Sequence, residues 1–274
     1  MSKRKYPRIT LFVSFLLALS LALVGCSSPA PTEDTVVKVG ATAVPHAEIL
    51  EFVKPKLAEK GITLDIIVFN DYVQPNLATD AGEIDGNYFQ HIPYLDTFNA
   101  DHKLDLVSIA KVHIEPMAIY SKKFSAVTDF EKGSTVAIPN DPSNAGRALS
   151  VLQSAGVIKL KDGVGIMGTI QDITENPQEL EVIMIDAAQL PRVLDDPKVS
   201  GAVINTNYAL EADLNPTSDA LYIESKESPY SNIFVVKADR AEDPVLKQIA
   251  EELNTEDVRA FIEEQYKGAV VPAF

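Results

Sequence analysis

The chain has 274 residues with 24 basic and 39 acidic side chains, which gives a net charge of −15 at neutral pH. Such an acidic chain should repel nucleic acid and anionic lipid headgroups, so we expect no nucleic-acid partner. Its length suits one large domain or two moderate ones, and its single cysteine excludes a disulfide within the chain.

The first 25 residues predict a signal peptide. The segment 11–24 is an apolar run of 14 residues, interrupted only by Ser14 and Ser20, and it is short for a membrane-spanning helix, which needs roughly 20 residues. The run ends in Leu-Val-Gly-Cys at 23–26, which resembles the bacterial lipobox, whose cysteine is joined to diacylglycerol and becomes the new N-terminus. Four basic residues precede the run: Lys3, Arg4, Lys5 and Arg8.

Cys26 is therefore the expected lipidation site, and its acyl chains would hold the protein on the extracytoplasmic side of the cell membrane. Residues 26–35 lack apolar periodicity and predict a flexible tether. Removal of residues 1–25 takes away four basic side chains and changes the net charge from −15 to −19. Two alternatives stay open, namely an ordinary signal peptide with a chance cysteine and a retained transmembrane anchor.

The first half of the mature chain alternates short β-branched runs with helical patterns. Residues 106–122 form the longest extended pattern, and Pro116 marks an irregularity in it. Gly61 stands where a glycine is expected just after a helix. Strands are expected at 36–41, 63–69 and 84–88, and helices at 45–60, 73–81 and 93–100.

The same alternation continues in the second half and predicts a mostly parallel α/β fold with covered sheet faces. Because there are too many units for one sheet, we expect two lobes. Crossings near 113–122 and 228–237 would give lobe 1 residues 36–115 plus 233–274 and lobe 2 residues 116–232. Strands are expected at 135–139, 180–185, 201–204, 220–224 and 233–237, helices at 142–155, 187–195 and 207–212, and a long helical region at 244–266.

Sequence motifs for catalysis are missing: there is no Gly-x-Ser-x-Gly elbow, no His-Glu-x-x-His and no phosphate-binding glycine loop. We therefore expect neither an enzyme nor a cofactor. His46, His91, His102 and His113 could form a metal site with nearby carboxylates. Their spacing does not enforce the four converging ligands that zinc needs, so we expect no metal site.

One candidate site combines aromatic and polar residues at the ends of two strands. Residues 71–76 follow the second predicted strand, and residues 87–95 span the end of the third strand and the start of a helix. In open α/β sheets ligands bind beyond the carboxyl ends of the strands. Four side chains could thus wall one pocket, although each aromatic could equally belong to the core: Tyr72, Phe89, His91 and Tyr94.

Polar residues at two further places could complete that pocket. Asp141 and Pro142 predict a helix start, where free backbone N–H groups favour an anion, and Arg147 adds a bidentate donor for a carboxylate. Amides follow later strands at Asn205, Asn207 and Asn232. Alternatively, Arg147 is a solvated surface charge and the amides cap turns.

Five motifs in this order resemble those of the methionine-binding lipoproteins of the NlpA/MetQ family. They are Asp-Tyr-Val-Gln-Pro-Asn at 71–76, Asn-Tyr-Phe-Gln-His-Ile-Pro-Tyr-Leu at 87–95, Pro-Asn-Asp-Pro-Ser-Asn with Gly-Arg at 139–147, Asn-Thr-Asn-Tyr-Ala at 205–209 and Glu-Ser-Pro-Tyr-Ser-Asn at 227–232. The resemblance covers nearly all of residues 37–272, including the opening Val-Gly-Ala-Thr at 39–42, and it extends to the lipobox. The loop at 40–46 departs somewhat from the common family form.

The resemblance implies a two-lobed periplasmic-binding-protein fold, type II-like, with the ligand in the cleft between the lobes. Arg147 would hold the ligand carboxylate, Asn205 and Asn232 would bind the carboxylate and α-amine, and Asn144 would lie nearby. The aromatic residues would enclose a thioether side chain, which suits methionine.

By the same resemblance the protein would be a monomeric, lipid-anchored receptor of an ABC importer. It would capture L-methionine, with D-methionine and derivatives as further candidates, and deliver it to the permease and ATPase complex. Two alternatives stay open: a receptor of the same family for a methionine-containing dipeptide or another amino acid, and a surface adhesin or structural lipoprotein.

Overall fold

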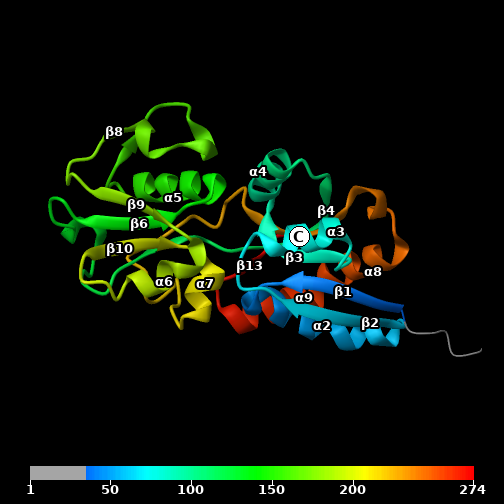
Figure 1. Cartoon of the computed structure of the whole chain (residues 1–274). Coiled ribbons are helices and arrows are strands. Elements are labelled where there is room, and N and C mark those ends of the chain that lie inside the picture. Colours follow the sequence, from blue (N-terminus) through cyan, green and yellow to red (C-terminus); the bar gives the residue numbers. More distant parts are fainter. Residues whose placement is uncertain (1–34) are drawn as a thin grey trace, which may run out of the picture. The chain divides into compact units, whose positions relative to one another are not determined.

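The computed structural model describes residues 35–274 (Figure 1). The predicted signal peptide, Cys26 and all of the predicted tether except Thr35 lie outside the described residues. Thr35 itself is the first residue of a strand. Among residues 35–274, none of the helices has the length and apolar character needed to cross a membrane.

Lobe 1 is built on a six-stranded sheet with the order β13-β4-β12-β3-β1-β2. β1 runs parallel to β2 and β3, whereas β12 is antiparallel to β3 and β4, and β13 is antiparallel to β4. The strands are β1 (Thr35–Ala41), β2 (Ile62–Val68), β3 (Gly86–His91), β4 (Leu106–Ile114), β12 (Ser231–Lys237) and β13 (Val271–Pro272).

The C-terminal helices of the chain share a core with its first strand. Val39 of β1, Leu50 of α2, Ile249 of α8 and Ile262 of α9 belong to one buried cluster, which also contains Phe234 of β12. The last helices therefore return to lobe 1, as Figure 1 shows. The helical elements of this lobe are η1 (Ala43–Ala47), α2 (Glu48–Glu59), α3 (Gln74–Ala81), α4 (Ile92–His102), η6 (Ala238–Arg240), α8 (Pro244–Leu253) and α9 (Glu256–Tyr266).

Lobe 2 is built on a five-stranded sheet with the order β11-β5-β10-β6-β9, which is also mixed. Successive residues along its strands point to opposite faces and enter two different cores. Ile138 packs with Leu149 of α5 on one face, while Ala137 packs with Leu190 of α6 and Ala209 of α7 on the other. The strands are β5 (Ala118–Tyr120), β6 (Thr135–Pro139), β9 (Glu181–Ile185), β10 (Val199–Ile204) and β11 (Tyr222–Ile223).

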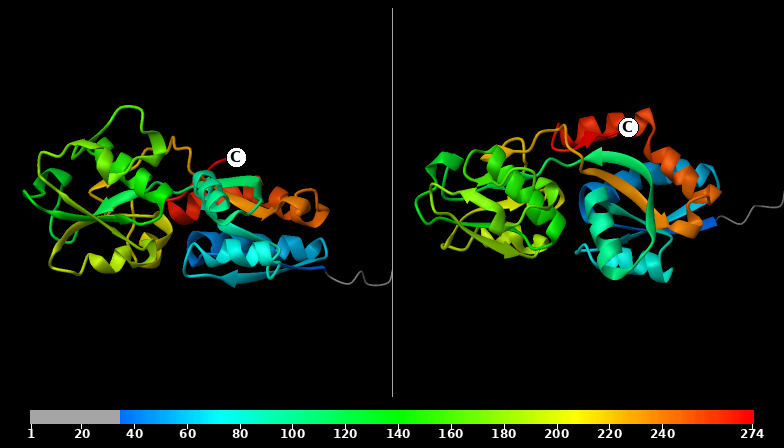
Figure 2. Two further views of the ribbon diagram at one scale, coloured as in Figure 1. Left: turned by 45° about the horizontal axis from the view of Figure 1, so that its top comes forward. Right: turned by 90° about the horizontal axis from the view of Figure 1, so that it is seen from above.

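Helices cover both faces of this second sheet (Figure 2). A separate two-stranded sheet pairs β7 (Lys159–Leu160) with β8 (Ile173–Glu175). The helical elements are η2 (Val127–Asp129), α5 (Pro142–Ser154), η3 (Gly165–Met167), η4 (Ile170–Asp172), η5 (Ala187–Gln189), α6 (Leu190–Val193) and α7 (Thr206–Glu211).

The expectation of mostly parallel sheets is wrong. Both sheets are mixed because the chain leaves lobe 1 after β4, enters lobe 2 at β5 and returns through β12, and each of these strands pairs antiparallel with neighbours. A buried strand has the same apolar composition whichever way it runs, so the pattern of residues could not reveal these directions.

The expected C-terminal helical region at 244–266 is confirmed, and it consists of two helices. α8 ends at Leu253 and α9 starts at Glu256, after Thr255 adopts an extended conformation with φ −87° and ψ 157°. Other expectations are confirmed: β6 has the predicted bounds, and Gly61 follows α2 with a φ of 76°. The short strands β7, β8 and β13 were not predicted.

Candidate functional site

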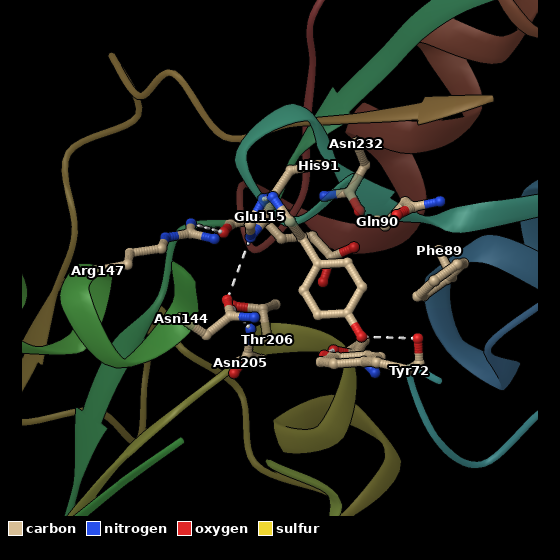
Figure 3. A pocket seen from close by; sticks show the side chains of 12 residues that line it. Tyr72, Phe89, Gln90, His91, Glu115, Asn144, Arg147, Asn205, Thr206 and Asn232 are labelled. Carbon is tan, nitrogen blue, oxygen red and sulfur yellow. Dashed lines mark hydrogen bonds between the residues drawn. The ribbon is translucent and has the colours of Figure 1, made fainter. Parts of the chain in front are cut away.

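All eight site residues expected from the sequence line a single pocket (Figure 3). From lobe 1 they are Tyr72, Phe89, His91, Tyr94 and Asn232, and from lobe 2 they are Asn144, Arg147 and Asn205. Asn232 was expected at the end of lobe 2 but lies in β12 of the lobe 1 sheet. The pocket has four further lining residues, which are Gln90, Glu115, Thr206 and Asn207. Of these, the sequence pointed only to Asn207, as an amide that follows a strand.

Aromatic rings form one side of the pocket. The Tyr72 ring centre lies 5.8 Å from the centres of both Phe89 and Tyr94, and 4.9 Å from that of Tyr208 in lobe 2. The Tyr72 hydroxyl donates a hydrogen bond to Asn207 Oδ1 at 2.5 Å, and the Tyr94 hydroxyl donates to the Tyr72 carbonyl at 2.8 Å. These contacts fix the ring edges and join the two lobes at this side.

A buried amide network holds this wall in position from behind. Gln90 Nε2 donates to Asn76 Oδ1 at 2.6 Å, and Asn87 Nδ2 donates to Thr79 Oγ1 at 2.7 Å and to Asn76 Oδ1 at 3.0 Å. α3 buries few apolar residues, so these hydrogen bonds attach it to β3. Asn76 and Asn87 thus have a structural role within the two sequence motifs, 71–76 and 87–95, that also contain the aromatic residues.

His91 links the two lobes through a hydrogen bond and is the N-cap of α4. Its Nδ1 accepts from the Tyr94 backbone N–H at 3.2 Å, which leaves the proton on Nε2. Nε2 can then donate to Asn144 Oδ1, 3.1 Å away in lobe 2. Burial lowers the pKa of His91 to about 3, with the Arg147 charge acting in the same direction, so the ring is neutral at pH 7.

The start of α5 is occupied by the chain's own carboxylate. Asp141 is the N-cap, and its Oδ1 accepts from the Asn144 backbone N–H at 2.9 Å, while both of its oxygens accept from Asn144 Nδ2 at 3.0 Å. The expected anion at this helix N-terminus is therefore Asp141. Since the Asn144 amide nitrogen is bound there, its Oδ1 faces the other way and accepts from Asn205 Nδ2 at 2.9 Å.

Arg147 is buried, with 2% of its surface exposed, and its charge is already paired. Its Nη2 donates to Glu224 Oε2 at 2.6 Å and to the Glu115 carbonyl at 2.7 Å, and its Nε lies 3.2 Å from both Glu224 oxygens. The Tyr230 ring centre lies 4.2 Å from the guanidinium carbon. Across residues 35–274, no hydrogen bond falls on Nη1.

A buried cluster of His46, His113 and Glu115 adjoins the pocket. Glu115 Oε1 lies 2.7 Å from His113 Nε2 and 3.1 Å from His46 Nε2. Burial lowers the pKa of His46 to about 4 and that of His113 to about 3, and it raises the pKa of Glu115. His46 and His113 belong to the histidine set considered from the sequence, but Glu115 was not singled out there, because 69 positions separate it from His46.

The donor atoms of this cluster lie within 4.8 Å of one another and could hold a metal ion. They are three in number, however, one fewer than the four ligands of a structural zinc site. The other two histidines lie elsewhere: His91 bonds Asn144, and His102 is exposed and stacks on Phe98 with ring centres 4.1 Å apart. The described residues thus bring together only part of the histidine set considered from the sequence.

Two curated relatives match almost the whole chain. The "D-methionine-binding lipoprotein MetQ" of Escherichia coli K12 is 40% identical over 253 residues, which cover 92% of this chain and 93% of the relative. The "Membrane lipoprotein TpN32" of Treponema pallidum is 40% identical over 262 residues, with coverage of 95% and 96%. A family model described as NlpA lipoprotein matches residues 37–274.

Solved structures share the two-lobed fold. A nutrient-binding protein from Burkholderia cenocepacia bound to methionine has a TM-score of 0.83 and 46% identity, covering 87% of this chain and all of the other. A periplasmic substrate-binding protein of an ABC transporter from Coxiella burnetii has a TM-score of 0.82 and 41% identity, covering 86% of this chain and 100% of the other. The predicted periplasmic-binding-protein fold is thereby confirmed.

Proposed function

Since the chain belongs to the NlpA lipoprotein family, we propose that it is the substrate-binding lipoprotein of an ABC importer and that its ligand is L-methionine. It would act by binding and release, not by catalysis. The observation that carries this proposal is the pocket itself, in which a buried arginine and several amides face an aromatic wall formed largely by lobe 1.

The polar end of the pocket suits a carboxylate. Arg147 Nη1 has no partner among the described residues, and Asn232 can add a second donor. The Asn232 Oδ1 lies 3.0 Å from His46 Nε2, so the amide nitrogen is the atom left to face a ligand. A carboxylate held by a guanidinium and an amide N–H receives charge-assisted hydrogen bonds, which are about twice as strong as neutral ones.

The aromatic end suits a thioether. Tyr72, Phe89 and Tyr94 present ring faces and edges to the same space, and a polarizable sulfur atom packs favourably against such rings. The nearby His91 ring is neutral. An uncharged ligand side chain can therefore pack beside it without removing water from a charged group. D-methionine and methionine derivatives place the same groups in the pocket and are the next candidates.

Binding would favour the closed arrangement of the lobes, because the ligand would contact both. Two side-chain hydrogen bonds already cross between the lobes, from Tyr72 to Asn207 and between His91 and Asn144. A lipid on Cys26 would keep the closed, loaded receptor within reach of the permease and ATPase complex. The family assignment and the names of the relatives as lipoproteins support this anchoring on the extracytoplasmic side.

A thermal-shift screen tests the proposal. The panel would contain the twenty amino acids, D-methionine, methionine sulfoxide and the dipeptide Gly-Met, added to protein freed of ligand by unfolding and refolding. At a hundredfold excess over Kd a ligand stabilises by about 2.7 kcal/mol, which is roughly 5–10 °C in Tm for a chain of this size. We expect the largest shift with L-methionine. A shift with Gly-Met alone would favour the dipeptide receptor, and no shift with any compound would reject the proposal.

A further inference from the structure

Most of the exposed large apolar side chains gather at two surface hollows. Six such side chains among residues 35–274 are at least 40% exposed. Three of them, Val73, Met167 and Met184, line the hollows, and a fourth, Ile166, precedes Met167 in η3. Apolar groups that gather in this way mark a surface for a partner, whereas single scattered ones do not. We propose that the permease of the importer docks on these two hollows, and that the first of them makes docking depend on closure of the lobes.

The first hollow is built from both lobes. Lobe 1 contributes Val73, Phe98 and Asp101, and lobe 2 contributes Pro142 and Ser143. It lies where α4 packs against α5 across the lobes (Figure 1). Because its two halves belong to different lobes, opening of the lobes would take the hollow apart. A partner that fits this hollow therefore binds the closed receptor in preference to the open one.

This hollow adjoins the ligand pocket but is separate from it. Tyr94 lines both. Pro142 and Ser143 stand at the start of α5, and the same helix brings Asn144 and Arg147 to the ligand pocket. The hollow has a volume of about 180 Å³, which is below the roughly 300–1,000 Å³ of typical ligand clefts. It therefore suits a side chain of a partner protein.

The second hollow belongs to lobe 2 alone and carries no charge. It lies between α5 and the segment 167–171, with Met184 of β9 beside them, and none of its lining residues is acidic or basic. An uncharged apolar hollow stands out on a chain whose mature form has a net charge of −19. Pro142 borders both hollows, so the two form one surface that extends from lobe 1 to lobe 2.

The charges at the first hollow indicate the chemistry of the partner. Asp101, Asp141 and His102 line it, and none of its lining residues is lysine or arginine. Asp141 is the N-cap of α5, whereas Asp101 forms no ion pair within residues 35–274. A segment with an apolar side chain for the hollow and a lysine or arginine for Asp101 is complementary. Anionic lipid headgroups or a second copy of this acidic chain would instead bring like charges together.

An importer permease is the partner that needs such a surface. This inference rests on the proposed function and goes beyond it, since the ligand pocket does not say where the permease binds. A permease with equal affinity for the open and closed receptor would not distinguish an empty receptor from a loaded one. A hollow that requires both lobes supplies the difference in affinity, while the second hollow adds apolar contact on lobe 2.

Carboxylates placed in the hollows should block delivery of methionine without affecting its capture. Val73→Glu and Met167→Glu each put a charge in one hollow, and Val36→Glu is the control, because Val36 is also exposed but lies at the start of β1. The readout is uptake of radiolabelled L-methionine by cells that carry each variant in place of the native gene. An unpaired charge buried in an interface weakens it by about tenfold or more, so uptake at limiting methionine should fall by about that factor for both hollow variants.

The control Val36→Glu should transport methionine at the wild-type rate. Titration calorimetry should give the wild-type methionine affinity for all three variants, since none of these residues lines the ligand pocket. Wild-type uptake by either hollow variant would overturn the proposal.

Site-specific photo-cross-linking identifies the occupant and does not depend on loss of function. Val73, Met167 or Val36 would be replaced by the photoreactive amino acid p-benzoylphenylalanine, and cells would be irradiated with and without L-methionine. We expect the two hollow positions to form adducts with the permease, identified by mass spectrometry, and position 36 to form none. At position 73 the adduct should require methionine, because the first hollow needs both lobes.

Two outcomes of the cross-linking would contradict the inference. Adducts of the hollow positions with lipid or with a second copy of the receptor, in place of the permease, would reject the docking surface. A permease adduct at position 73 that forms equally well without methionine would reject its dependence on closure.

Failure of this inference can be told apart from failure of the proposed function. If the wild-type chain supports methionine uptake and the hollow variants do so equally, only the docking surface is rejected. If the wild-type chain binds no amino acid and supports no uptake, the proposed function is rejected and the docking surface with it.

Discussion

At the scale of single residues, the pocket shows how a buried arginine is kept both charged and available. Glu224 takes the Nε and Nη2 edge of Arg147, the Glu115 carbonyl takes a second Nη2 hydrogen, and Tyr230 covers one face of the guanidinium. The sequence predicted a bidentate donor for a ligand. In the structure the bidentate edge is engaged by Glu224, and Nη1 has no partner among residues 35–274.

Arg147→Ala should weaken methionine binding at least tenfold, because it removes the charged partner of the ligand carboxylate. It should also lower Tm, since Glu224 loses its ion pair in a largely buried place, with 16% of its side chain exposed. Titration calorimetry well below the Tm of the variant would measure the affinity.

Arg240→Ala is the control for this prediction. Arg240 also forms ion pairs with carboxylates, those of Asp85 and Asp243, but it lies outside the pocket. Its removal should leave methionine affinity unchanged. If Arg147→Ala binds methionine as tightly as the control does, Arg147 is not the carboxylate partner.

At the scale of elements, α5 carries much of the lobe 2 site, and its position depends on a close approach. Asn144 and Arg147 both belong to α5 and both line the pocket. Between them lies Gly146, where an added Cβ would come within 2.2 Å of the Ile166 carbonyl oxygen in η3. The glycine in this motif therefore serves packing, whereas Asn144 and Arg147 line the pocket.

Gly146→Ala should destabilise the protein by about 1–3 kcal/mol, because backbone must shift to admit the methyl group. Chemical denaturation followed by circular dichroism would measure the free energy of unfolding. Ser154→Ala, at the exposed end of the same helix, should change it by no more than about 0.5 kcal/mol. Equal free energies of unfolding for the two variants would mean that the Ile166 segment moves aside without destabilising the protein.

The elements themselves were largely predictable, since periodicity and end signals are local. β6 was expected at its observed bounds, and α5 begins at Pro142, where Asp141 and Pro142 indicated a helix start. Strand directions were not predictable, and neither was the break at Thr255 between α8 and α9. Both depend on what each segment packs against, which a local pattern does not contain.

At the scale of the whole molecule, three buried histidines make stability depend on pH. Burial lowers the pKa of His46 to about 4 and those of His91 and His113 to about 3, whereas in the unfolded chain each titrates near 6.5. The unfolded state therefore binds more protons than the folded state between about pH 3 and 6.5. Stability from these rings is complete above pH 6.5 and is lost as the pH falls.

We expect Tm to fall between pH 7 and pH 5. Over this range each of the three histidines should lower the free energy of unfolding by about 2 kcal/mol. The raised pKa of Glu115 acts in the opposite direction, but one carboxyl group does not offset three rings. Differential scanning calorimetry at a series of pH values would measure the slope.

His91→Asn provides the comparison that isolates one ring. Asparagine retains an acceptor for the N-cap of α4 but does not titrate, so the variant should show a shallower loss of stability with falling pH than the wild type. Identical slopes would show that protonation of His91 is not linked to unfolding.

By itself the sequence determined the lobed α/β class, the approximate positions of most elements and the eight residues that line the pocket, because each of these leaves a trace in a short stretch of chain. Only the tertiary structure decided which polar atoms of those residues are paired within the protein and which are not. Glu115 joins His46 and His113 through contacts between segments far apart in the chain, and Glu224 orients Arg147 across 77 positions. Hydrogen-bond polarity in a buried site is set by the partners that folding brings together, and no local pattern encodes those partners.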